Sequence, residues 1–94
     1  MIFIINNLKY DTDKMELITD KTKVFVEHPL LFLGFNGGFV DSKIYKSKKS
    51  RYLEVYEKSG KVQGDALSKK EVKMKLMQYD THKYEELFGK IKEA

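Results

Sequence analysis

The stretch IYKSKKSRYLEVY, residues 44–56, has the pattern of a β-hairpin. In its second half, aliphatic side chains alternate with aromatic or acidic ones, which is the two-residue period of a strand with one buried face. The polar and basic residues 46–50 interrupt the apolar pattern just before it. We therefore expect two antiparallel strands at 43–45 and 51–57, joined by a turn at 46–50.

The N-terminal segment predicts a second, shorter hairpin. The β-branched run 2–5 is followed by Asn6 and Asn7, and asparagine tolerates the positive φ that a tight turn requires. Residues 8–10 then return as a strand, and the first strand is expected to pair within the main sheet. The acidic cap that follows indicates one or two helical turns at residues 14–18.

The most apolar part of the chain lies in its middle. Alternation at residues 22–27 predicts a strand, which His28-Pro29 ends because the residue before proline avoids the helical region. We expect residues 30–35, continued by residues 39–40, to form a central strand and much of the core. If part of this block is exposed, it is instead an interface for a second copy or another partner, because large apolar patches on small monomers mark contacts.

Two helices are expected after a connecting loop at residues 61–66. Ser68 and Glu71 have the spacing of a capping box, which predicts a helix over residues 69–79.

A second short helix should run through Phe88, with Asp80 or Thr81 as its N-cap and Gly89 as its C-terminal stop. The apolar side chains expected to pack the helices onto one face of the sheet are Val72, Leu76, Tyr79, Tyr84, Leu87 and Phe88. The fold class is therefore α+β, in one domain over residues 1–94: an antiparallel sheet of four to five short strands with two C-terminal helices packed on one face.

The amino-acid composition of the chain excludes several classes of protein. The 94 residues are 41% hydrophobic and 34% charged, an ordinary balance for a folded domain, and there is no cysteine to form a disulfide or a thiolate metal site. No apolar run reaches the roughly 18 residues of a membrane span, so we expect a cytoplasmic protein that makes no membrane contact. The charge is uneven: residues 1–42 carry four Lys against six Asp and Glu, whereas residues 43–94 carry fourteen Lys and Arg against eight. A basic half favours an anionic or acidic partner.

No residue pattern indicates catalysis, a cofactor or a metal. The two histidines, His28 and His82, lack the companion ligands of a zinc site, although Asp80 lies two residues before His82. The neighbouring carboxylates Glu85 and Glu86 are typical of a solvated helix face rather than of a pair converging in a pocket. We therefore expect a non-enzymatic protein without a cofactor.

The candidate partner-binding site is the basic hairpin, where five cations lie within nine residues with no acid between them. Cations interleaved with aromatic faces suit a single-stranded nucleic acid or an acidic protein groove. The alternative is a solvated turn whose lysines deter aggregation. The predicted contact residues are Lys43, Tyr45, Lys46, Lys48, Lys49, Arg51, Tyr52 and Tyr56.

Three pieces of the sequence resemble a group of small proteins from Firmicutes and their mobile elements. They are KYDT at 9–12 followed by LI at 17–18, IYKSKK at 44–49, and LSKKE at 67–71 followed by KYEELFG at 83–89. The chain departs from the group at residues 20–41, in its lack of tryptophan, and at Ser50, where a glycine is common.

Some small proteins of such origin inhibit bacterial defence systems, including anti-CRISPR proteins. The resemblance implies a phage- or plasmid-carried inhibitor that binds a host defence protein, such as a Cas effector, and blocks it sterically. The alternative is a small basic nucleic-acid-binding accessory protein that uses the 43–56 hairpin. The chain is expected to act as a monomer or a homodimer.

Overall fold

The computed structural model describes residues 1–27 and 30–94. Along the chain, its strands, 3-10 turns and helices are β1 (Ile2–Ile5), β2 (Leu8–Asp11), η1 (Thr12–Lys14), β3 (Glu16–Val26), η2 (Leu31–Leu33), β4 (Gly38–Lys46), β5 (Tyr52–Lys58), β6 (Lys61–Leu67), α1 (Lys69–Tyr79) and α2 (Thr81–Phe88). The break expected at His28-Pro29 lies outside the described residues. The α+β prediction is confirmed, because a four-stranded antiparallel sheet precedes two C-terminal helices.

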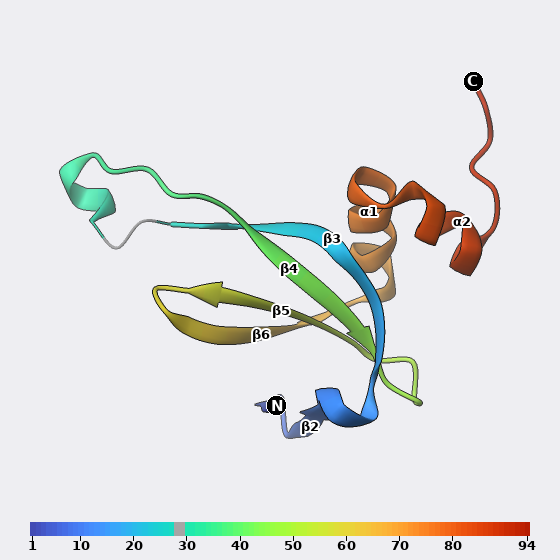
Figure 1. Cartoon of the computed structure of the whole chain (residues 1–94), viewed down its shortest axis with the longest axis horizontal. Helices are drawn as coiled ribbons and strands as arrows, with labels where there is room; N and C mark the ends of the chain where they lie inside the picture. The colour runs from blue at the N-terminus through green and yellow to red at the C-terminus, as the bar shows by residue number, and fades with distance from the viewer. Residues whose placement is uncertain (28–29) are drawn as a thin grey trace.

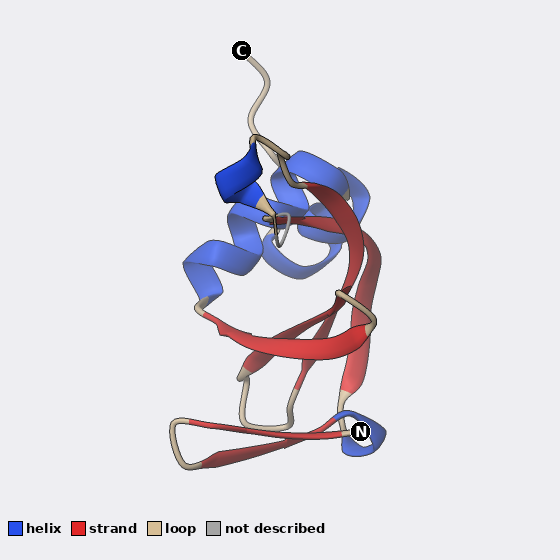
Figure 2. Cartoon of the chain, turned by 90° about the vertical axis from the view of Figure 1, so that its left-hand side faces the viewer, coloured by secondary structure: helices blue, strands red, loops and turns tan. Residues whose placement is uncertain are grey.

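The molecule has three layers (Figures 1 and 2). The central layer is the sheet, in the strand order β3-β4-β5-β6, with each strand antiparallel to the one before it. The two helices lie on one side of this sheet, and the β1–β2 hairpin lies on the other. None of the described helices is long and apolar enough to cross a membrane.

Successive apolar side chains of β5 point to opposite faces of the sheet, which explains why the helices cover one face and the β1–β2 hairpin covers the other. On the helix side, Tyr52 packs with Ile44, Val72 and Leu76, and these four side chains are buried. On the hairpin side, the aliphatic members of the same strand form a second cluster. Its buried members are Tyr10, Leu53 and Val55, with Phe3, Ile5, Met15 and Tyr45 packed against them.

The predicted helix signals are confirmed. Ser68 Oγ accepts a hydrogen bond from the backbone N–H of Glu71 at 3.1 Å, and the Glu71 carboxylate accepts one from the backbone N–H of Ser68 at 3.0 Å. These bonds lower the pKa of Glu71. Asp80 is the N-cap of α2, and Gly89 ends that helix with a φ of 95°.

Asp80 also ties the helices to β3, since its buried carboxylate accepts a hydrogen bond from the Thr19 hydroxyl at 2.8 Å. Burial alone would raise the pKa of this carboxyl. The bonds from Thr19 and from the backbone N–H of Lys83, with the nearby Lys21 and Lys83 charges, outweigh burial and lower the pKa.

Of the six predicted helix contacts, Val72 and Leu76 are fully buried, while Tyr84 and Phe88 pack against the core. Tyr79 is half-buried, and Leu87 is 37% exposed.

Three predictions about secondary structure are wrong. Residues 61–66 belong to strand β6 rather than to a loop, because Gly64 leaves room there for the Phe3 ring, which a Cβ would meet at 2.7 Å. Residues 14–18 form the end of η1 and the start of β3 rather than a helix. Finally, β1 pairs with β2 in a sheet of its own instead of joining the main sheet.

A fourth prediction is also wrong, namely that residues 30–35 form a central strand and much of the core. Residues 30–35 form the far end of a long hairpin, which extends from the sheet at the left of Figure 1. Here strands β3 and β4 pair with each other from Lys23–Asp41 to Val26–Gly38, while the β4–β5 pairing begins only at Ser42. We call residues 23–27 and 30–41 the arm. The arm helps to give the chain a radius of gyration of 14.7 Å, against about 12 Å for a compact domain of this length.

A buried polar network lies at the root of the arm, on the helix side of the sheet. The Thr22 and Ser42 hydroxyls are 2.6 Å apart, and Ser42 donates a hydrogen bond to the Glu54 carboxylate at 2.7 Å. Lys75 of α1 donates to the same carboxylate oxygen at 2.8 Å and to the backbone carbonyl of Lys23 at 3.0 Å. The network thus connects α1 to β5, β4 and the first residue of the arm.

Candidate functional site

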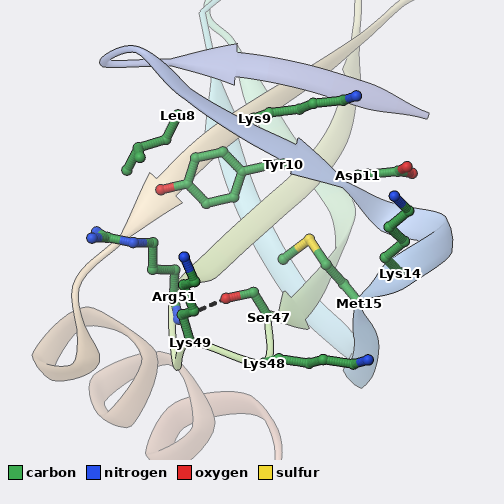
Figure 3. A pocket seen from close by; sticks show the side chains of 10 residues that line it. All are labelled: Leu8, Lys9, Tyr10, Asp11, Lys14, Met15, Ser47, Lys48, Lys49 and Arg51. Carbon is green, nitrogen blue, oxygen red and sulfur yellow. Dashed lines mark hydrogen bonds between the residues drawn. The ribbon is translucent and has the colours of Figure 1, made fainter.

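At the opposite end of β4 from the arm, the β4–β5 turn faces the N-terminal hairpin across a shallow pocket of about 550 Å³. We call this pocket the basic shelf (Figure 3). Its lining comes from two segments that are far apart in sequence. The lining residues are Leu8, Lys9, Tyr10, Asp11, Lys14, Met15, Ser47, Lys48, Lys49 and Arg51.

The lower wall of the shelf is a tight turn held by Ser47. Its backbone N–H donates to the carbonyl of Arg51 at 2.8 Å, and its hydroxyl accepts from the backbone N–H of Arg51 at 3.1 Å. The backbone N–H of Ser50 donates to the Ser47 carbonyl at 3.0 Å, and Ser50 has a φ of 59°. Because the turn satisfies its own backbone groups, the exposed Lys48, Lys49 and Arg51 side chains are left to face the shelf.

The upper wall is positioned by the β1–β2 hairpin. The turn expected there is confirmed, with φ of 50° at Asn6 and 64° at Asn7. The chain then enters η1, where the Asp11 carboxylate accepts a hydrogen bond from the backbone N–H of Asp13 at 3.1 Å. Tyr10 is 7% exposed and anchors this segment on the sheet.

The electrostatics of the shelf follow from its lining. Lys9 and Lys14 border it on one side, and the three cations of the turn border it on the other, while the Tyr10 ring and the Met15 side chain lie between them in Figure 3. Asp11 is the single acidic residue in the lining, and it is already bonded to the backbone. Five cations around a partly apolar floor suit a ligand that carries several negative charges and a flat apolar group.

Sequence reasoning missed Lys9 and Lys14 as members of this site. Both residues are more than thirty positions away from the turn, and no local signal links them to it. The link is the packing of Tyr10 and Met15 against Leu53 and Val55, a contact between layers.

The structure divides the eight predicted contact residues into separate groups. Lys48, Lys49 and Arg51 line the shelf, and Lys46 borders the neighbouring hollow together with Lys14 and Lys48. Tyr45 is half-buried in the hairpin-side cluster and lines a different hollow together with Lys43.

Two predicted tyrosines lie on the helix side of the sheet. Tyr52 is 6% exposed in the core, so its ring does not interleave with the exposed cations. The Tyr56 hydroxyl donates to Asp65 at 2.9 Å. Burial and this bond raise the pKa of Tyr56 to about 12.

Within residues 1–27 and 30–94, no three His, Cys, Asp or Glu side chains lie together as a metal site would require. Comparison with known proteins finds no matching family, no matching curated protein and no matching solved structure.

Proposed function

We propose that this protein is a non-enzymatic, cytoplasmic binding protein that holds single-stranded nucleic acid on the basic shelf. The observation that carries the proposal is that one pocket is lined by five cations from two distant segments, with Tyr10 and Met15 between them. The cations are Lys9, Lys14, Lys48, Lys49 and Arg51. Cations pair with successive phosphates and release counterions, while the half-buried Met15 side chain offers an apolar contact to a base or a sugar.

The geometry favours a single strand over a duplex. The shelf is a hollow between a turn and a hairpin, and neither α1 nor α2 contributes to its lining, so neither helix is placed there to enter a major groove.

The test is fluorescence anisotropy with a labelled oligo(dT) or oligo(rU), titrated at about 50 and about 200 mM salt. The test variant replaces Lys48, Lys49 and Arg51 by Ser. A control variant replaces three cations away from the shelf, Lys58, Lys70 and Lys92, by Ser, so that the net charge falls equally.

If the proposal is right, the native chain binds with an affinity that falls steeply with salt, and the shelf variant reduces the salt slope by about 2, at about 0.7 per lost phosphate contact. The control variant should keep most of the affinity. Equal loss in both variants would mean that only net charge matters and would refute the shelf as the site.

A second candidate function is inhibition of a bacterial defence system, for example an anti-CRISPR protein that blocks a Cas effector by occupying its surface. The arm favours it, because exposed phenylalanines such as Phe32 are more typical of protein contacts than of nucleic-acid contacts. This candidate is tested by affinity capture from the lysate of a low-GC Gram-positive host. It requires one stoichiometric defence protein that survives nuclease treatment, whereas heterogeneous, nuclease-sensitive partners would support the first candidate.

A further inference from the structure

The arm exposes an unusual amount of apolar surface for a chain of 94 residues. Phe32 and Leu33, both in η2 at its tip, are 80% and 60% exposed. Behind them, Phe25 and Phe39 form an edge-to-face pair across the two strands, with ring centroids 5.5 Å apart, and are 54% and 64% exposed. Phe35, which is 52% exposed, belongs to the same region.

The exposed area is close to what an interface requires. At about 200 Å² for a fully exposed ring, the four phenylalanines together expose on the order of 500 Å². That is near the upper end of the largest apolar patch on an ordinary monomer, and Leu30 and Leu33 add to it. Two such patches facing each other would bury up to about 1,000 Å² in total, which is the lower bound for a specific protein interface, before their polar margins are added.

The charge of the arm limits the kind of partner. No Asp, Glu, Lys or Arg occurs between Glu27 and Asp41. The arm as a whole carries one cation, Lys23, and these two anions. The remainder of the chain carries the positive charge. A polyanion or an anionic bilayer would therefore find no cation at the tip of the arm, whereas an identical tip could pack against it without desolvating a charge.

We propose that the arm is the contact surface between two copies of this chain. The dimer is isologous, with the exposed phenylalanine surface of one arm packed against the same surface of the other. The arm enters the contact already ordered at its root, where Lys75 and Glu54 hold its first residues to α1 and β5, so less ordering entropy is lost on binding.

The proposed dimer leaves both basic shelves open. The tip of the arm lies beyond the Gly38 end of β4 and the shelf lies beyond the Lys46 end. The nine residues of β4 between them span about 30 Å at about 3.3 Å per strand residue. The inference is therefore independent of the proposed nucleic-acid binding, and its test uses no nucleic acid.

The first measurement is sedimentation velocity of the full chain from about 1 to about 200 µM. The tip variant is Phe32→Ser with Leu33→Ser. Its control is Ile4→Ser with Met74→Ser, since those side chains are 69% and 62% exposed on other elements. We expect a concentration-dependent dimer in the native chain and the control, and a Kd at least about 30-fold weaker in the tip variant. Circular dichroism checks that both variants are folded.

The second measurement leaves the apolar surface intact. Because the chain has no cysteine, Asn36→Cys introduces a single thiol for a spin label near the tip, and Glu93→Cys provides a distant reference. An arm-to-arm dimer gives short inter-protomer distances at position 36 and long ones at position 93.

Three results would overturn the proposal: a monomer at every concentration, a dimer that survives in the tip variant, or short distances at position 93 instead of position 36. A monomer whose tip instead binds anionic vesicles, or captures one foreign protein, would likewise refute self-association. Because none of these measurements involves the shelf, failure of the dimer and failure of nucleic-acid binding are separate outcomes.

Discussion

The two ends of β4 carry opposite kinds of surface. At the Lys46 end, five cations surround a small pocket whose floor is anchored in a buried cluster. At the Gly38 end, the arm exposes phenylalanine and leucine on a segment with no charge between Glu27 and Asp41. A surface of the first kind recognises charge, and its binding affinity falls as salt is added. A surface of the second kind recognises apolar shape, and salt does not weaken its binding. Residue type alone therefore predicted neither surface, because the apolar block is exposed whereas Tyr52 of the basic hairpin is buried.

The largest expected effect comes from the network that joins the arm to the sheet. Glu54→Ala removes a buried carboxylate, 2% exposed, to which both Lys75 and Ser42 donate. Lys75 is left with the Lys23 carbonyl and Ser42 with the Thr22 hydroxyl. Because Lys75 keeps partial access to water, we expect a loss of about 3 kcal/mol in the free energy of unfolding, at the lower end for a broken buried pair. Urea denaturation measures it. Glu57→Ala, an exposed position on the same strand, should change stability by less than about 0.5 kcal/mol.

A loss of similar size in both variants would mean that the network does not anchor the arm. If only Glu54→Ala is destabilised, amide exchange should also show faster opening of the strand pairs at the root of the arm, Lys23–Asp41 among them.

The second-largest expected effect comes from a substitution that should disturb the arm and leave the shelf unchanged. A Cβ added at Gly37 would lie 1.9 Å from the backbone carbonyl oxygen of Val26, so Gly37→Ala must push the strands of the arm apart. Gly38→Ala, at the adjacent residue with open space around the new methyl group, is the matched control. We expect Gly37→Ala to cost about 2 kcal/mol and to weaken dimerisation, with the control nearly unchanged.

Oligonucleotide affinity is the discriminating measurement for this pair. The shelf lies at the far end of β4, so Gly37→Ala should leave the affinity of each shelf for a short oligonucleotide unchanged. A loss of that affinity would show that the arm and the shelf act as one surface, which would contradict their assignment as separate surfaces.

The sequence predicted best those features that depend on neighbouring residues. The Asn6-Asn7 turn, the Ser68 capping box and the 44–56 hairpin follow from local chemistry, and all three are present. Apolar residues 30–35 were misjudged because hydrophobicity was taken as burial, although nothing in this chain covers the described part of the arm's tip.

Two other errors have a common cause, which is packing between layers. Residues 61–66 were expected to be a loop, but they form β6, where the missing side chain of Gly64 makes room for Phe3. Lys9 and Lys14 reached the shelf only because Tyr10 and Met15 pack against the sheet. Sequence periodicity predicts which face of an element is apolar, but it does not predict which layer covers that face.

A smaller effect is expected within the turn that forms the lower wall of the shelf. Ser50 has a φ of 59°, a left-handed conformation in which a side chain is strained, so Ser50→Gly should stabilise the protein by about 0.5 kcal/mol. Ser47→Gly should instead destabilise it, because the hydroxyl that accepts from the Arg51 backbone N–H is lost. Thermal unfolding measures both variants, and a destabilised Ser50→Gly would contradict the assigned turn.

The smallest effect at neutral pH concerns Tyr56, a predicted contact residue that lies away from the shelf. Its hydroxyl is bonded to Asp65, and its pKa is raised to about 12 from an ordinary 10.0. The protonated phenol is therefore stabilised in the folded state; that contribution is complete below pH 10 and is lost as the pH rises through about 12. Absorbance at the phenolate band should show a component that titrates near pH 12 and is lost in Tyr56→Phe. Because Tyr56→Phe removes no cation from the shelf, it should leave oligonucleotide affinity within about twofold of native. A larger loss would mean that the binding surface reaches from the turn to the helix side of β5. It would contradict the assignment of the shelf as a site separate from the rest of the sheet.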